Sequence, residues 1–277
     1  MEDGSFGLRV VSMRCLVAEP GASFEWHSHP FEEFTLVADD KATIGYPPGK
    51  RTMQENTLLM YHRGERHGAW CLPGQAPRFW VVHFTANAQF YQQADRLRAA
   101  SAKDRVWQLS PEQAASFKGI FLRMLTERMQ RRNLSRLAES AWLQLLLISV
   151  ERWVKGETVA DLSPAGTNPE AMRLWHLVNA SVGKPDELAK QIHQMPNYDS
   201  LRHAFRKTFG CSPRKMMLSL RLQQAKNMLL ETSLSIKEIS IRAGYQRQHE
   251  FARAFHQQVG VAPSEWRANP IQSSLTV

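Results

Sequence analysis

The chain has 277 residues, of which 43% are apolar and 22% are charged, and its formal net charge is +9. This composition excludes a mainly disordered chain, and the length favours two domains. No apolar run reaches the roughly 18 to 20 residues of a membrane helix, and Met1 to Val10 lacks the pattern of a signal peptide. The three cysteines are widely spaced, which argues against a disulfide framework or a thiolate zinc site. These features predict a soluble, cytoplasmic protein with no membrane partner.

The first part of the chain, up to about Phe84, has the pattern of short strands separated by turns rich in Pro, Gly and Asp. Regular short strands favour an antiparallel barrel or sandwich over parallel sheet units. The expected strands are Arg9–Ala18, Glu33–Ala38, Lys41–Tyr46, Thr57–Tyr61 and Arg78–Phe84.

From Pro111 onward the apolar residues recur with a helical period. Two amphipathic helices are expected, Pro111–Arg131 and Leu134–Lys155, and they could pack on the barrel or on a second subunit. The stretch 156–169 is rich in Gly and Pro, which is typical of a linker. The predicted fold class is therefore α+β with two domains: an antiparallel β barrel with helices over residues 1–155, and an all-α domain over residues 170–277.

Most of the positive charge lies in the second domain. From Asn168 to the last residue there are 15 Lys and Arg against 8 Asp and Glu, whereas residues 1–167 hold 20 against 18. A basic domain joined to a near-neutral one favours a polyanion partner for the basic half and a different partner for the other. On charge alone, a solvated basic surface is an equally good explanation.

The basic half contains two similar helical segments. In each, apolar residues at i, i+4 and i+8 precede a Gly that can end a helix and a Pro that can begin the next. Each segment also follows a shorter helix, which is the order of a helix-turn-helix unit. The expected helices are Pro169–Ser181, Pro185–His193, Tyr198–Phe209, Pro213–Glu231, Ile236–Ala243, Gln248–Val259 and Pro263–Arg267.

The polar faces of the two repeated segments carry side chains that can bond to base edges. Arg and Gln make bidentate hydrogen bonds to guanine and adenine in the major groove. An ordinary surface helix has a similar face, so the repeat, its Gly and Pro positions and the basic charge together favour double-stranded DNA. The residues of these faces are Asp199, Arg202, His203, Arg206, Gln248, His249, Glu250 and Arg253.

This half resembles the DNA-binding domain of the AraC/XylS family of bacterial transcription regulators over roughly Glu170 to Arg267. The resemblance implies two helix-turn-helix units joined by the long helix Pro213–Glu231. Their recognition helices would enter successive major grooves about 34 Å apart. The matching residues are Phe205, Arg206, Lys207, Gly210, Ser212, Pro213, Ile239, Ser240, Ala243, Gly244, Tyr245, Phe251, Arg253, Phe255, Gly260, Pro263, Trp266 and Arg267.

Carried over by position, the resemblance also implies which side chains contact DNA. Base contacts would come from Asp199, Arg202, His203, Gln248, His249, Ala252 and Arg253, and phosphate contacts from Arg206, Lys207, Arg214, Lys215 and Arg247. One departure concerns the first unit, where Met195-Pro196-Asn197 stands in place of a glycine turn and the spacing is about two residues longer. The register of the first recognition helix is therefore less well defined than that of the second.

In the N-terminal half, Gly21-x5-His27-x-His29-x3-Glu33 resembles the first cupin motif, and Gly64-x-x-His67 resembles part of the second. His27 and His29 are expected to alternate on one strand, so that both point inward. The resemblance implies either a divalent metal held by His27, His29, Glu33 and His67, or an effector pocket lined by the same residues without metal.

Three tryptophans, Trp26, Trp70 and Trp80, could complete such a pocket, because indole rings stack on the apolar faces of sugars and aromatic molecules. They could equally belong to the core.

These observations predict a sequence-specific transcription regulator that is not an enzyme. A small-molecule effector, for which a sugar is one candidate, would bind the barrel of a homodimer, and an activator would also contact RNA polymerase. A metal-dependent cupin enzyme (an isomerase or dioxygenase with a helical appendage) and a nonspecific nucleoid-binding module remain competing interpretations.

Overall fold

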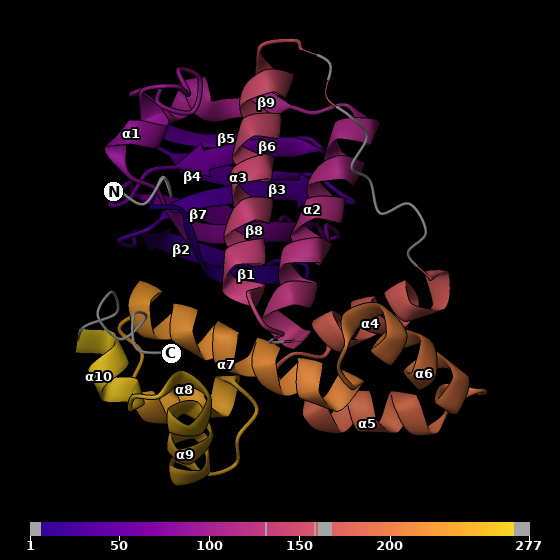
Figure 1. The fold of residues 1–277 in the computed structure, drawn as a ribbon. Helices are drawn as coiled ribbons and strands as arrows, with labels where there is room; N and C mark the ends of the chain where they lie inside the picture. The colour runs from indigo at the N-terminus through magenta and orange to yellow at the C-terminus, as the bar shows by residue number, and fades with distance from the viewer. Residues whose placement is uncertain (1–6, 131, 158, 160–167, 269–277) are drawn as a thin grey trace. The chain divides into compact units, whose positions relative to one another are not determined.

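The computed structural model describes residues 7–130, 132–157, 159 and 168–268 (Figure 1), and the chain divides into two compact units, Met1–Gly166 and Thr167–Val277. Of the predicted linker, residues 158 and 160–167 lie outside the described residues. Among the helices of the described segments, none combines the length and the hydropathy needed to cross a membrane.

The first unit contains two antiparallel sheets. One has the strand order β1-β8-β3-β6-β9 and the other the order β2-β7-β4-β5. The strands are β1 (Arg9–Val17), β2 (Ser23–His27), β3 (Glu32–Ala38), β4 (Ala42–Tyr46), β5 (Gly49–Met53), β6 (Thr57–Tyr61), β7 (His67–Trp70), β8 (Arg78–Thr85) and β9 (Val106–Gln108). A short helix α1 (Ala88–Tyr91) and a 3-10 turn (Ala102–Arg105) follow β8.

The five strands expected from the pattern of turns are confirmed, and the structure adds four strands outside those five ranges. The additional strands β2, β5, β7 and β9 have only three to five residues each. Strand β5 is Gly-Lys-Arg-Thr-Met and exposes its first four residues at a sheet edge, so it has no alternation of apolar and polar residues to detect.

Alternation along the strands gives the five-stranded sheet two different faces. Its inner face packs on the other sheet in one apolar core, to which Val37, Ile44 and Phe79 contribute. Its outer face is covered by helices α2 (Pro111–Gln130) and α3 (Ser135–Val154), which lie side by side over it (Figure 1). The rings of Trp80 and Phe121 meet there edge to face at 5.0 Å.

Within residues 168–268, the second unit contains helices and connecting turns and no strand, as predicted. Helices α5 (Pro185–His193), α6 (Tyr198–Phe209), α7 (Pro213–Glu231) and α9 (Gln248–Val259) begin and end at the predicted residues. The other three differ from the prediction by one residue at the C-terminal end: α4 (Pro169–Ala180), α8 (Ile236–Arg242) and α10 (Pro263–Ala268).

Two helix-turn-helix units, α5–α6 and α8–α9, are joined by α7. The second helices of these units, α6 and α9, both have 12 residues and start 50 positions apart in the sequence. Phe205 and Phe209 are buried in the first, and Phe251, Phe255 and Val259 in the second. Both helices end at a glycine with positive φ, Gly210 at 69° and Gly260 at 83°.

The turn of the first unit uses an asparagine where a glycine is expected. Asn197 has φ of 61° immediately before α6, whereas Gly244 has φ of 77° in the turn of the second unit. Asparagine is one of the few residues with a side chain that adopt the left-handed conformation readily. The chain therefore makes this turn without a glycine, and α6 begins at Tyr198 as expected.

Arg221, in the middle of α7, connects the two helix-turn-helix units. Its Nε donates a hydrogen bond to the carbonyl oxygen of Ala243 at 2.5 Å, and its guanidinium lies 4.1 Å from the centre of the Tyr245 ring. A Cβ on Gly244 would lie 2.9 Å from Pro185 Cδ and 3.0 Å from Gly183 O. The start of the first unit therefore touches the turn of the second next to Arg221.

Replacing Arg221 should loosen this connection. The Arg221→Met substitution removes the donor to Ala243 O, a loss of about 1–3 kcal/mol when the acceptor is left unpaired in a partly buried place. Amide hydrogen exchange over residues 243–247 should then rise by about 5- to 150-fold at neutral pH. Arg214→Met, at an exposed position of the same helix, is the matched control. Equal exchange in both variants would show that Arg221 does not hold the turn.

Candidate functional site

The proposed DNA-contacting side chains lie on the outward faces of α6 and α9 and on the adjoining turns. All of them are exposed except Ala252, which is half-buried. They are Asp199, Arg202, His203, Arg206 and Lys207 of the first unit and Arg247, Gln248, His249, Ala252 and Arg253 of the second. These side chains point away from the apolar core of this unit and are accessible to a ligand.

The two recognition helices present different chemistry at equivalent positions. With the offset of 50 residues, Arg202 corresponds to Ala252 and His203 to Arg253. Arg202 also lies 3.3 Å from Asp199 in an exposed ion pair, which orients its guanidinium along the helix. Each helix would therefore recognise a different set of base edges, and one DNA site would not be a simple repeat of one half.

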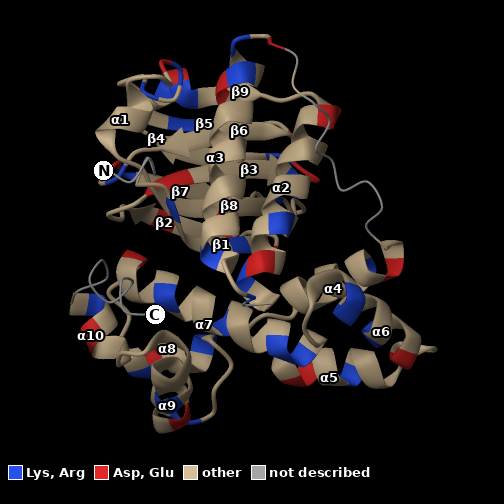
Figure 2. Cartoon of the chain, viewed as in Figure 1, with Lys and Arg blue, Asp and Glu red and all other residues tan. Residues whose placement is uncertain are grey.

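The geometry of α7 suits binding to two grooves. It has 19 residues, so it is about 28 Å long. In Figure 1, α6 lies at one end of α7 and α9 at the other. Figure 2 shows Lys and Arg on most helices of this unit. The first turn of α7 contains Arg214 and Lys215. Such charge attracts the phosphate backbone.

The second candidate site is inside the β domain and is built on Glu33. In the middle of the five-stranded sheet, Ser12, His83, Glu33 and Tyr61 lie directly opposite one another on the neighbouring strands β1, β8, β3 and β6. Opposite residues of antiparallel strands share a face, so all four point to the inner side. Sequence reasoning missed His83, although a lone histidine in the apolar run Arg78–Phe84 was a signal that could have identified it.

Three histidines surround the Glu33 carboxylate. The Oε2 atom of Glu33 lies 2.6 Å from His83 Nε2, 3.0 Å from His29 Nε2 and 3.6 Å from His67 Nε2. Thr35 donates a hydrogen bond to the other oxygen, Oε1, at 2.5 Å. Glu33 and the three imidazoles are all buried.

The cluster holds the Glu33 side chain in its ionised form. Burial by itself raises the pKa of Glu33, but the charge of His67 and hydrogen bonds from His29, His67 and His83 outweigh it and hold the pKa well below the usual value. Burial lowers the pKa of His83 to about 4, assisted by repulsion from His29 and opposed by Glu33. At neutral pH the site therefore combines an ionised carboxylate with a neutral His83.

The structure corrects two details of the predicted metal set. Strand β2 ends at His27, so His29 lies in the following loop and not on the same strand. Among the described residues, the ligand atoms that lie within 4.8 Å of one another come from His29, Glu33 and His83. Imidazole and carboxylate groups are suitable ligands for a divalent transition metal. The set that fits such a metal is therefore His29, Glu33 and His83, and His83 was not in the predicted set.

The three tryptophans expected at the pocket lie elsewhere. Strand β2 has a bulge between Phe24 and His27, which turns Trp26 to the outer face of its sheet. Trp26 and Trp70 pack on each other at 5.5 Å and cover Gly45, where a Cβ would come within 2.8 Å of both rings. Trp80 is buried under α2, on the outer face of the five-stranded sheet and away from the pocket.

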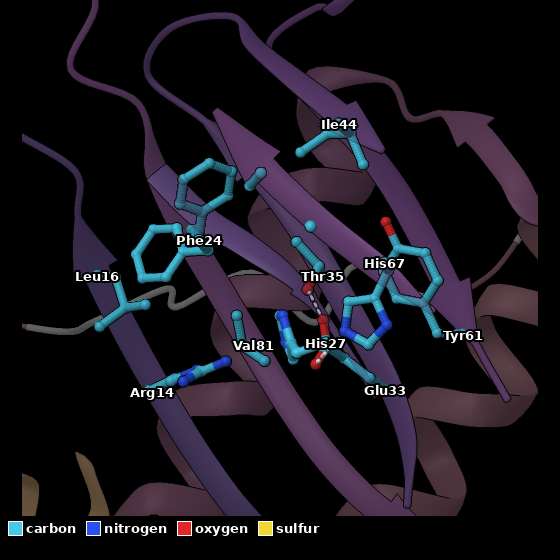
Figure 3. A pocket seen from close by; sticks show the side chains of 13 residues that line it. Arg14, Leu16, Phe24, His27, Glu33, Thr35, Ile44, Tyr61, His67 and Val81 are labelled. Atoms are coloured by element: carbon cyan, nitrogen blue, oxygen red, sulfur yellow. Dashed lines mark hydrogen bonds and ion pairs between the residues drawn. The ribbon is translucent and has the colours of Figure 1, made fainter. Parts of the chain in front are cut away.

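A cavity of about 40 Å³ adjoins the Glu33 cluster between the two sheets. Figure 3 shows the side chains of Glu33, His27 and His67 at one part of its wall and Phe24 and Ile44 at another. The Tyr61 ring stacks on His67 at 4.1 Å. The wall therefore combines polar groups with apolar and aromatic surfaces, as ligand sites do. Its other lining residues are Arg14, Leu16, Thr35, Gly68, Ala69, Phe79 and Val81.

Comparison with known proteins gives matches for both the second unit and most of the chain. A model of a helix-turn-helix domain matches residues 197–269. The HTH-type transcriptional activator RhaR of Cronobacter sakazakii is 28% identical over 265 residues, which cover 90% of this chain and 88% of that protein. The HTH-type transcriptional regulator YtdP of Bacillus subtilis is 28% identical over 127 residues, or 42% of this chain. The match spans only 16% of that longer protein.

A crystal structure of ToxT from Vibrio cholerae aligns with 92% of this chain and 96% of its own, with 12% identity and a TM-score of 0.38. The sequence relatives are transcription regulators and not enzymes, and the helix-turn-helix match falls on the α6 to α10 region. The second unit is an AraC-type helix-turn-helix domain, and the chain is a DNA-binding transcriptional regulator with an N-terminal β-rich domain.

Proposed function

We propose that this DNA-binding regulator reads its operator with both recognition helices and answers to a small molecule bound in the β domain. The observation that carries the proposal is the pair of equivalent helices, α6 and α9, which bury one apolar face each and expose polar faces at the two ends of α7. Two helices that enter successive major grooves read one face of the duplex.

Base recognition would depend most on the exposed arginines of the two helices. Arg202 and Arg253 can each form two hydrogen bonds to a guanine, while Gln248 can do the same with an adenine. Arg206, Lys207, Arg214, Lys215 and Arg247 would contact phosphates, which position the protein without distinguishing sequences.

Arg253→Ala should relax the base preference of the second unit. Loss of a bidentate contact costs about 1–3 kcal/mol of discrimination, which is about 5- to 150-fold between the preferred base and its competitors. Selection of bound sites from a randomised DNA library would measure this. The control is Gln257→Ala, an exposed position in the last turns of α9. If both variants select the same sites as the unmodified chain, Arg253 does not read a base.

The effector site would be the cavity beside Glu33. Its polar and apolar walls suit a hydroxylated ligand such as a sugar, whose ring faces are apolar and whose hydroxyls bond to imidazole and carboxylate. The cavity of about 40 Å³ has room for a few water molecules. A sugar would therefore require the two sheets to move apart. The sugar would bind the conformation with separated sheets better than the one with closed sheets. This difference in affinity shifts the population of the two conformations and so changes the affinity for the operator.

Filling the cavity should abolish this response. Ala69 lines the cavity from β7 and is half-buried, so Ala69→Leu would occupy the space without touching the second unit's DNA-contacting residues. With a panel of pentoses and hexoses, at least one sugar should raise the Tm of the full chain and change its operator affinity. In Ala69→Leu both effects should disappear, while operator affinity without sugar stays the same. A sugar effect that persists in the variant would place the effector elsewhere.

Homodimerisation would use the outer face of α3. Helix α2 buries its apolar residues against the five-stranded sheet, whereas α3 leaves an apolar stripe outside. Leu134 and Leu137 are 66% and 64% exposed, and Ala141, Leu145 and Ile148 continue the stripe with exposed or half-buried side chains. A stripe of this kind on one helix can pair with the same stripe of a second copy around a two-fold axis.

Leu137→Glu should separate the two copies, because dimerisation would bury its charge in an apolar seam. Light scattering coupled to size exclusion should then report 31.7 kDa, the mass of one chain, instead of twice that mass. Arg136→Glu changes the charge at a neighbouring exposed position and should leave the dimer intact. A dimer that tolerates Leu137→Glu would exclude α3 as the interface.

A further inference from the structure

Four histidines of the β domain are oriented by partners outside the Glu33 cluster. The Nδ1 atom of His29 lies 3.0 Å from Phe31 O, that of His67 lies 2.9 Å from Glu65 O, and that of His27 lies 2.8 Å from Glu25 O. His83 Nδ1 lies 2.8 Å from Ser12 Oγ. Histidine ligands of metals characteristically bond through their other ring nitrogen in this way, which fixes the ring and directs the ligating atom.

The directed atoms of three of these histidines meet at one oxygen. His83, His29 and His67 place Nε2 at 2.6, 3.0 and 3.6 Å from Glu33 Oε2. Neighbouring ligand atoms around a first-row metal, with bonds of 2.0–2.2 Å, are separated by about 3 Å in octahedral and about 3.5 Å in tetrahedral geometry. The spacings in the cluster are thus close to those of a coordination shell.

From this geometry we infer a binding site for a divalent transition metal ion with His29, Glu33 and His83 as its ligands. Glu33 supplies Oε2, since Thr35 bonds to Oε1. His67 stands next to the set and can supply a fourth nitrogen. This assignment goes beyond the proposed effector response and does not depend on it.

The identity of the third ligand distinguishes this site from the one implied by the cupin motif. The motif implies His27, but the ring of His27 lies against His67, with centroids 4.4 Å apart, and 6.2 Å from the ring of His29. The ring of His83 lies 4.5 Å from that of His29 and belongs to the strand paired with Glu33. His83 is therefore the ligand, and His27 belongs to the cavity wall.

The donor set also narrows the class of ion. Two imidazoles and one carboxylate suit zinc, nickel, cobalt or iron(II), whereas calcium and magnesium prefer oxygen donors. The carboxylate offsets part of the charge of the ion, which a buried site needs. The adjoining cavity, lined by Glu33 and His67, leaves room for water molecules on the open side of the ion.

Metal titration of the untagged full-length chain tests the inference. Cobalt(II) added to metal-free protein should bind at one equivalent per chain and give visible d–d absorption, and zinc should displace it. His83→Gln should lose this high-affinity equivalent, whereas His27→Gln should retain it. Circular dichroism establishes whether each variant is folded. Magnesium should give no saturable binding.

A second measurement needs no variant. X-ray absorption spectroscopy of the zinc-loaded chain should show two or three imidazole nitrogens together with oxygen in the first shell. A chain that takes up no stoichiometric cobalt or zinc would overturn the site. Loss of the metal in His27→Gln with retention in a folded His83→Gln would overturn the ligand assignment, as would a first shell without imidazole.

Discussion

In the DNA-binding half, each recognition helix buries large apolar residues four positions apart, and this burial turns the opposite face of the helix outward. Phe205 and Phe209 in α6, and Phe251, Phe255 and Val259 in α9, occupy the buried positions. Since burial of one large aromatic side chain is worth several kcal/mol, rotation of the helix about its axis is prohibitively unfavourable. Because the buried face of each helix is fixed, Arg202 and Arg253 point toward solvent. Helix α7 sets the separation of the two faces because it packs on α4 and α6 and also contributes Leu222, Ala225 and Leu229 to the apolar core that includes Phe251 and Phe255 of α9.

The β domain relies on a comparable constraint around a polar residue. Glu33 is buried and ionised, and its charge is stable there because the strand pairing sets His83 beside it while a loop and the opposite sheet supply His29 and His67. Buried charges without such partners are very unfavourable. The imidazole and carboxylate groups that stabilise one another here are also groups that can coordinate a metal ion or bond to a hydroxylated ligand. Stability and ligand binding thus share one set of side chains.

The helical half was largely predictable from the sequence, because Gly and Pro mark helix ends and the apolar period marks the buried face. Four of its helices have the predicted bounds. The β domain was less predictable. The bulge in β2 reverses the inward and outward sides after Phe24, so simple alternation places Trp26 inside and the structure places it outside. The pairing of Glu33 with His83 joins residues 50 positions apart, and no local pattern encodes a register of this kind.

On its operator, one chain should insert α6 and α9 into successive major grooves on the same face of the duplex. Hydroxyl-radical and methylation footprinting of a selected operator, read at single-nucleotide resolution, tests it most directly. Two protected patches, centred one helical turn apart, are expected for each chain, with guanine N7 protection in both. Protection limited to a single major groove, or spread evenly along the DNA, would contradict it.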